Sequence, residues 1–275
     1  MAKQKISAQA SAVVTGAGSG IGRAFAQELA ARGGRVICAD INLATAEETV
    51  AMIIAKGGQA HALRCDVSQL ADVEALAEQA EAWLRGPVDL IINNAGVGAG
   101  GQVVGELPMA DWQWALGINL WGVIHGCHVF APRLRSLGRG GIINVCSTAS
   151  FAAAPRMAAY NVSKAAALAL SETLAAEMAG TGIAVTALCP TFVKTNIARD
   201  GRITAGSSRM AEKIMDWIGF APERVVKTTL DALDKNQLYV LPQFDARMIW
   251  RSKRLAPALY ARGAGLINRY AGSSL

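Results

Sequence analysis

Short apolar runs alternate with longer amphipathic segments along most of this sequence. The runs are rich in Val, Ile and Leu and show little alternation with polar residues, which is typical of strands covered on both faces. An alternating order of strands and helices requires right-handed crossovers. The sequence therefore predicts an α/β fold, a Rossmann-like, doubly wound, mostly parallel sheet of seven strands with helices on both faces. The expected strands are Ala12–Thr15, Arg35–Ala39, Ala60–Cys65, Val88–Ile92, Gly141–Cys146, Ile183–Leu188 and Leu238–Leu241.

Amphipathic segments of helical length lie between these runs, and no repeat or linker divides the chain. We expect one domain over residues 1–275, with a core over 10–242, a substrate lid over 191–220 and a basic C-terminal tail over 243–275. Ser68 is the expected N-cap of the third helix. The expected helices are Ile21–Arg32, Ala44–Lys56, 68–85, Asp111–Leu137, Ala158–Ala179 and Pro222–Leu233.

Composition narrows the class of protein. Hydrophobic residues make up 52% of the 275 residues and charged residues 17%, so the chain can bury a large core. No apolar run approaches the roughly 20 residues of a spanning helix, and no apolar stretch follows Lys3 and Lys5. We expect neither a signal peptide nor a membrane span, and a cytoplasmic location. The five cysteines include no CxxC pair, which favours buried reduced thiols over zinc or a disulfide framework.

The net charge of +6 is concentrated in the tail. Residues 246–275 contain six basic residues and no acid, so residues 1–245 sum to zero. This distribution argues against nucleic-acid binding by the main body. The tail also carries apolar residues, and Pro257 is expected to divide it into two short helices. It could lie on an anionic membrane, pack on the body where it covers the substrate pocket or a subunit contact, or remain solvated. Its apolar residues are Trp250, Leu255, Leu259, Tyr260, Leu266, Ile267 and Tyr270.

A glycine-rich turn, TGAGSGIG, spans residues 15–22 between the first strand and the first helix. Backbone N–H groups at such a helix start can face a diphosphate. Asp40 closes the second strand, where a carboxylate can accept hydrogen bonds from ribose hydroxyls and repel a 2′-phosphate. No basic residue follows it directly, which favours NAD over NADP. Arg23 and Arg35 are the residues that could still make NADP acceptable.

Tyr160 and Lys164 stand four residues apart in a helical segment, so they lie one turn apart on one face. A neighbouring ammonium should lower the pKa of the phenol and make it a general acid or base. Ser147 follows a buried strand, at the sheet edge where ligands of doubly wound folds bind. Its hydroxyl could bond a substrate oxygen on which charge develops.

Together these features resemble the short-chain dehydrogenase/reductase family over about residues 10–242. The motifs that carry the resemblance are TGAGSGIG, Cys65-Asp66-Val67, Asn93-Asn94-Ala95-Gly96, Asn119, Ser147, and Tyr160 with Lys164. The resemblance implies catalysis by Asn119, Ser147, Tyr160 and Lys164, with Asn119 holding a relay water. It implies no metal for the chemistry. The implied cofactor-binding residues are Gly16, Ser19, Gly20, Ile21, Asp40, Asp66, Val67, Asn93, Ala95, Gly96, Tyr160, Lys164, Pro190, Val193 and Thr195.

One departure from the family stands at Pro190-Thr191, where the family usually has Pro-Gly. The expected function is hydride transfer between NAD(H) and a hydrophobic secondary alcohol or ketone. The alternatives are an NADPH-dependent 3-oxoacyl reductase and a non-catalytic nucleotide-binding protein. The resemblance suggests a homodimer or homotetramer through the two long helices. The apolar residues expected at the substrate pocket are Phe151, Met157, Phe192, Trp217 and Phe220.

Overall fold

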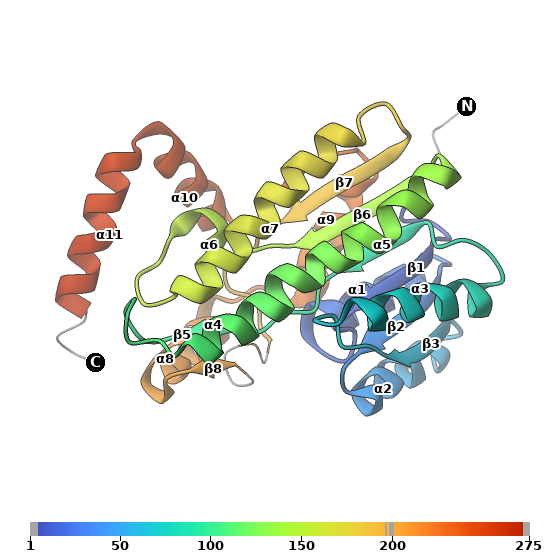
Figure 1. Cartoon of the computed structure of the whole chain (residues 1–275), viewed down its shortest axis with the longest axis horizontal. Helices are drawn as coiled ribbons and strands as arrows, with labels where there is room; N and C mark the ends of the chain where they lie inside the picture. Colours follow the sequence, from blue (N-terminus) through green and yellow to red (C-terminus); the bar gives the residue numbers. More distant parts are fainter. Residues whose placement is uncertain (1–4, 196, 198–200, 272–275) are drawn as a thin grey trace.

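The computed structural model describes residues 5–195, 197 and 201–271, and its centre is a seven-stranded sheet (Figure 1). Every pair of neighbouring strands is parallel. The fold predicted from the sequence is confirmed. The strands stand in the order β3 (Gln59–Arg64), β2 (Arg35–Asp40), β1 (Ser11–Thr15), β4 (Leu90–Asn93), β6 (Gly140–Val145), β7 (Ile183–Leu188) and β9 (Tyr239–Val240).

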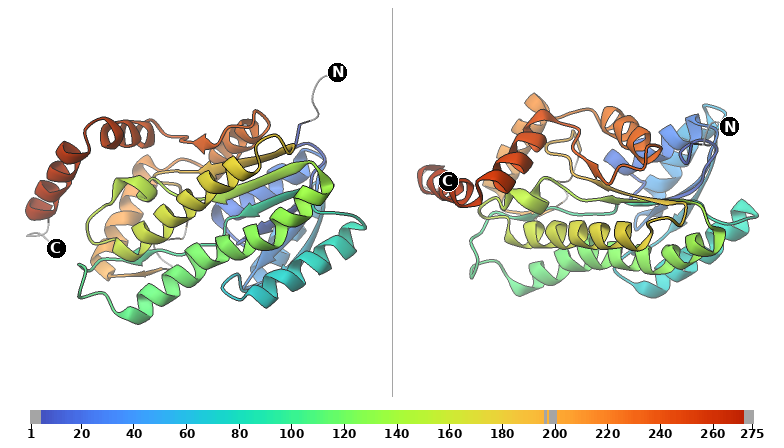
Figure 2. Two further views of the ribbon diagram at one scale, coloured as in Figure 1. Left: turned by 45° about the horizontal axis from the view of Figure 1, so that its top comes forward. Right: turned by 90° about the horizontal axis from the view of Figure 1, so that it is seen from above.

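Helices cover both faces of this sheet (Figure 2). One apolar layer joins it to α1 (Gly20–Ala31), α2 (Leu43–Ile54) and α9 (Pro222–Leu233), and the other to α3 (Leu70–Leu84), α5 (Gly122–Leu137) and α7 (Ala158–Glu177). Consecutive strand residues belong to opposite layers, as Ile142 and Ile143 do in β6. Because both faces are buried, the central strands consist mostly of apolar residues. The five cysteines are buried free thiols, as predicted.

Two expected helices differ in detail. The segment 111–137 is not one helix, because a π-helical turn, η1 (Gly117–Trp121), separates α4 (Met109–Leu116) from α5. Ser68 is not the N-cap of α3, which begins at Leu70 after Gln69. The Ser68 hydroxyl donates instead to Asp66 Oδ1 over 2.7 Å, so a local side-chain bond replaces the expected cap.

The region expected to form a lid has its own secondary structure. It contains β8 (Arg202–Ile203), which pairs in parallel with β5 (Ala99–Gly100), and α8 (Ala205–Ile218). Residues 196 and 198–200 of the region lie outside the described residues. Two-residue strands carry no periodicity, so the sequence did not reveal this small sheet. Mobility of the region stays a prediction.

The tail forms two helices, α10 (Phe244–Leu255) and α11 (Pro257–Ala271), as Pro257 predicted. Figure 2 shows α11 leading away from the sheet and its covering helices. The Tyr260 hydroxyl donates to the Ala152 carbonyl in α6 (Ala149–Ala152) over 2.9 Å. The side chains of Ile267 and Tyr270 lie outside the described part of the chain. No described helix is long and apolar enough to cross a membrane.

Candidate active site

A cavity of about 770 Å³ opens at the carboxyl ends of the central strands. The chain turns back across the sheet between β3 and β4, which leaves a crevice beside β1, where ligands of such sheets bind. The cavity brings together most of the residues predicted from the sequence. Its wall includes Gly16, Ser19, Gly20, Ile21, Asp40, Asp66, Val67, Ala95, Gly96, Ser147, Tyr160, Lys164, Pro190, Val193 and Thr195.

The glycine-rich turn lies in this wall with the left-handed backbone that glycine tolerates. Gly16 has φ 64° and Gly20 φ 51°. A Cβ atom on Gly16 would lie 2.8 Å from the Ala95 Cα atom, so only glycine allows the two loops to approach this closely. Ser19 precedes α1 in an extended conformation and makes no side-chain cap bond. Its hydroxyl and the first N–H groups of α1 are suited to a diphosphate.

Thr15 and Asn94 join this turn to the end of β4. The Thr15 hydroxyl accepts hydrogen bonds from the N–H groups of Asn94 (3.0 Å) and Ala95 (3.1 Å). The Asn94 side chain donates back to the Thr15 carbonyl over 2.8 Å. Asn94 lines the cavity; it belongs to the segment 93–96 expected to support the sheet and the cofactor, although it is not among the cofactor-binding residues named from the sequence. Its place in the Asn-Asn-Ala-Gly motif was the only signal for it.

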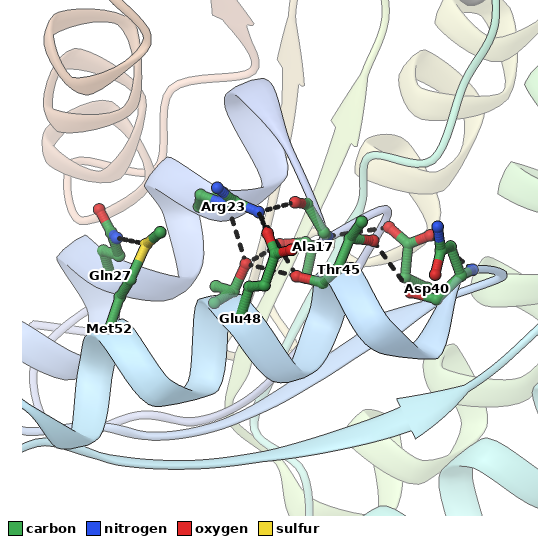
Figure 3. A network of polar contacts seen from close by, with 10 residues as sticks. Ala17, Arg23, Gln27, Asp40, Thr45, Glu48 and Met52 are labelled. Carbon is green, nitrogen blue, oxygen red and sulfur yellow. Dashed lines mark hydrogen bonds and ion pairs between the residues drawn. The ribbon is translucent and has the colours of Figure 1, made fainter.

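Asp40 stands in the wall at the end of β2, as a ribose-binding residue requires. Its carboxylate accepts the N–H of Gly18 (2.8 Å) and that of Asn42 (3.0 Å), which fixes its direction. Of the two arginines considered for NADP, one has other partners and the other lies at the far end of its strand. Figure 3 shows Arg23 beside Glu48, with an ion pair of 3.1 Å, and its guanidinium also donates to the Gly18 carbonyl. Arg35 begins β2, at the opposite end of the strand from Asp40.

Asp66 and Val67 form the neighbouring part of the wall, after β3. Asp66 Oδ1 accepts the Ser68 N–H over 3.0 Å as well as the Ser68 hydroxyl. The Val67 carbonyl bonds the His125 Nδ1 atom over 2.9 Å. Asp66 is therefore held by a local contact and Val67 by a contact with α5. Their predicted contacts with adenine stay predictions.

Two of the predicted residues, Asn93 and Asn119, lie behind the cavity wall. Asn93 is buried and donates to Asn144 Oδ1 over 2.8 Å. Asn119, on the π-helical turn, exchanges hydrogen bonds of 2.8 and 2.9 Å with the backbone of Val97. A Cβ atom on Gly96 would lie 3.1 Å from Asn119 Oδ1 and 3.3 Å from Lys164 Nζ, so both side chains approach this glycine. A relay water at Asn119 stays a prediction.

Ser147, Tyr160 and Lys164 meet on one wall of the cavity. Ser147 follows β6 and accepts the Ala149 N–H over 3.1 Å, while the other two lie on α7. The Lys164 side chain is buried, and its ammonium donates to the Val145 carbonyl over 2.9 Å. It lies 5.9 Å from the centre of the Tyr160 ring.

The electrostatics of this group differ from the sequence prediction. The pKa of the Tyr160 phenol is raised by desolvation, and a hydrogen bond with Ser147 opposes the rise. The pKa of Lys164 is lowered by burial. The Lys164 ammonium is directed to a backbone carbonyl, and the pKa of Tyr160 is raised and not lowered, so the predicted lowering by Lys164 is wrong. Spacing along a helix does not show how strongly a site is desolvated.

The apolar end of the cavity was predicted in part. Met157 and Phe192 line it as expected, together with Ile203, Met215 and Ile249. Three expected residues lie elsewhere: Phe151 and Phe220 pack against the two core layers, and Trp217 is 88% exposed. Ile249 belongs to α10, so the tail contributes to the wall. No periodicity linked this tail residue to the cavity.

Thr191, where the family usually has glycine, connects the tail to the loop after β7. Its N–H donates to Gln243 Oε1 (3.2 Å) and its hydroxyl to Asp245 Oδ1 (3.0 Å). The Gln243 amide also donates to the Phe192 carbonyl over 3.1 Å. A glycine would lose the hydroxyl bond. The departure therefore gives the loop a side-chain contact with α10.

Comparisons with known proteins agree with this geometry. The family model described as short chain dehydrogenase matches residues 10–205. "Probable oxidoreductase EphD" of Mycobacterium tuberculosis is 36% identical over 234 residues, which are 82% of this chain and 39% of that protein. The chain thus spans well under half the length of this relative. The 1-deoxy-11-beta-hydroxypentalenate dehydrogenase of Streptomyces exfoliatus is 33% identical over 256 residues, 90% of each chain.

A solved structure of a short-chain dehydrogenase/reductase from Burkholderia phymatum, in complex with NAD, superimposes with a TM-score of 0.87. It is 33% identical, and the match covers 94% of this chain and 96% of the other. The match covers more of the chain than residues 10–205, which the family model matches. With the matched residues and the shared fold, the chain belongs to the short-chain dehydrogenase family.

Proposed function

We propose that the protein is an oxidoreductase that transfers a hydride between NAD(H) and a hydrophobic secondary alcohol or ketone. The observation that carries the proposal is the meeting of Ser147, Tyr160 and Lys164 in the same cavity as the glycine-rich turn. A protein that only binds a nucleotide has no need of a phenol beside a buried ammonium. The match to a solved relative that holds NAD supports the cofactor class.

Each residue of the site has its own role in the proposed reaction. The cofactor, when bound, supplies or accepts the hydride. Tyr160 gives a proton to the substrate oxygen in reduction and takes it back in oxidation. Ser147 bonds the same oxygen and also stabilises the phenolate, because its hydrogen bond lowers the pKa of Tyr160. Lys164 would exchange its Val145 partner for the ribose of a bound nucleotide.

The test is turnover of a panel of hydrophobic ketones by the wild type and by Tyr160→Phe, followed at the absorbance of the reduced cofactor. Loss of the phenol hydroxyl should lower kcat by at least about hundredfold. Affinity for NADH, measured by fluorescence quenching, should fall by no more than about tenfold, the effect of one lost hydrogen bond. Equal turnover by the two proteins would remove Tyr160 from the mechanism.

NAD is the proposed cofactor because Asp40 lines the cavity and Arg23 already pairs with Glu48. An NADPH-dependent 3-oxoacyl reductase is the competing enzyme function. Comparing kcat/KM for NADH and NADPH distinguishes them, and a strong preference for NADPH would favour the second. A non-catalytic nucleotide-binding protein would bind either cofactor without turnover of any ketone.

The assembly and the location are proposals as well. Trp121, the last residue of η1 and directly before α5, is 52% exposed, and Val162 on α7 is 47% exposed. These exposed apolar side chains support a homodimer or homotetramer through the two long helical segments. The basic tail exposes Leu255 and Leu259, which is compatible with peripheral contact with an anionic membrane. A cytoplasmic location stays a prediction.

A further inference from the structure

The loop between α6 and α7 has an unusual backbone in the substrate end of the cavity. Ala153 has φ 52° and Arg156 φ 60°, the left-handed region that non-glycine residues rarely occupy. Two hydrogen bonds hold this conformation. Asn161 Nδ2 donates to the Ala154 carbonyl, and the Gly101 N–H donates to the Arg156 carbonyl, each over 2.7 Å. Backbone of this kind persists where surrounding contacts fix it, often at ligand sites.

Arg156 lines the cavity from this loop and is half-buried. Among the residues that the structure describes, its guanidinium has no hydrogen-bond or ion-pair partner. Some of the other described arginines pair with a carboxylate: Arg32 with Glu28 over 3.0 Å, and Arg202 with Asp111 over 2.9 Å. A guanidinium keeps its charge at any ordinary pH, so withdrawing it from water without an anion is unfavourable.

The charges of the cavity are separated along its length. The two carboxylates, Asp40 and Asp66, lie in the part of the wall that follows β2 and β3. The Lys164 ammonium already has a partner, the Val145 carbonyl. Arg156 lies at the other part, beside Met157, where Ile203, Met215 and Ile249 also contribute to the wall. The substrate end therefore combines an apolar wall with one cation that has no described partner.

We propose that Arg156 binds a carboxylate of the substrate, which makes the substrate class hydrophobic oxo acids and the corresponding hydroxy acids. The planar guanidinium can bond both oxygens of a carboxylate, and the fixed loop reduces the entropy lost on binding. Arg156 contacts a group remote from the reacting carbon, so it determines specificity. The proposal rests on the proposed redox function of the same cavity.

The experiment compares 9-oxodecanoate with its neutral methyl ester, reduced with NADH by the wild type and by Arg156→Gln. Arg156→Lys keeps the positive charge but cannot bond both carboxylate oxygens as a planar guanidinium can. Arg251→Gln is the control, because it removes an exposed charge outside the cavity wall. The wild type should prefer the acid by about tenfold to hundredfold in kcat/KM, chiefly through KM. Arg156→Gln should lose that preference with the ester unaffected, Arg156→Lys should keep part of it, and Arg251→Gln should match the wild type.

Equal kcat/KM values of the wild type for the acid and the ester would overturn the inference and leave the redox function intact. An equal fall of both values in Arg156→Gln would do the same. If neither compound is reduced, the redox function is decided by the panel of ketones, and calorimetry on the NADH-loaded protein decides the binding question. Decanoate should then bind at least about tenfold more tightly than decanamide, and only when Arg156 is present. Equal binding of the two probes excludes the carboxylate site. Should Arg156→Gln not fold, the wild type and Arg156→Lys still provide both comparisons.

Discussion

At the scale of single residues, the chemistry of Tyr160 depends on its surroundings more than on its helical neighbour. Desolvation raises the pKa of the phenol, and the Ser147 hydrogen bond lowers it. Oxidation of an alcohol needs the phenolate, so its rate should rise as the pH rises through that pKa. Reduction of a ketone needs the phenol and should fall over the same range.

Ser147→Ala should therefore move both pH profiles of kcat/KM to higher pH, because it removes the contact that lowers the pKa of Tyr160. It should also lower kcat for lack of the second donor to the substrate oxygen. Ser150→Ala is the matched control. It removes a nearby serine hydroxyl that donates to a backbone carbonyl, that of Lys164 over 2.7 Å, and not one that bonds the Tyr160 phenol. A shift of the Ser147→Ala profile to lower pH would contradict this account.

Asp40 supports a second prediction at this scale. Asp40→Asn removes the charge that opposes a 2′-phosphate and can still accept the Gly18 N–H. The ratio of kcat/KM for NADPH to that for NADH should rise by roughly tenfold, which corresponds to about 1.4 kcal/mol. Asp66→Asn also lies in the wall but should affect both cofactors alike. An unchanged ratio in Asp40→Asn would remove Asp40 from cofactor selection.

Residue types and spacing identified Asp40, Tyr160 and Lys164 as site residues, and all three line the cavity. They did not show that the Lys164 ammonium donates to Val145, or that Thr191 contacts Asp245. Those partners come from other strands and helices. Motif spacing fixes which residues share a turn, whereas their hydrogen bonds depend on tertiary packing.

At the scale of elements, long and strongly patterned segments were predictable, and short irregular ones were not. The seven strands were all expected, with ends that differ by one or two residues. The pairing of β5 with β8 and the π-helical turn at 117–121 were not expected. A single π turn leaves no mark in hydrophobic periodicity, yet this one carries the buried Asn119.

The approach of α5 to β4 depends on Gly126. A Cβ atom there would lie 1.9 Å from Asn93 Oδ1, and Asn93 is bonded to Asn144, whose amide donates to Ser171 over 2.9 Å. Gly126→Ala should displace Asn93 and lower the free energy of unfolding by about 1–3 kcal/mol, measured by urea denaturation. Gly265→Ala on α11 meets no atom within 4 Å and should be neutral or stabilising by up to about 1 kcal/mol. Equal free energies of unfolding of the two variants would show that a side chain at position 126 can be accommodated beside Asn93.

At the scale of the whole molecule, the tail contacts two walls of the substrate end. Asp245 bonds Thr191 in the loop after β7, Ile249 lines the cavity, and Tyr260 bonds the Ala152 carbonyl in α6. The glycine-rich turn and Asp40, in contrast, lie in the part of the wall formed by the loops after β1 and β2. The C-terminal segment should therefore influence substrate binding more than cofactor binding.

Removal of residues 257–275 tests this division between the two ends of the cavity. The truncated protein loses the Tyr260 bond to α6, so KM for a hydrophobic ketone should rise by about fivefold, the effect of one hydrogen bond of about 1 kcal/mol. The dissociation constant for NADH should change by less than about twofold, since no hydrogen bond of the described residues 257–271 reaches a residue expected to hold the nucleotide. Tyr260→Phe keeps α11 and should reproduce most of the change in KM. A parallel loss of NADH affinity in the truncated protein would mean that α11 supports the whole fold, because a contact confined to α6 cannot alter the loops after β1 and β2.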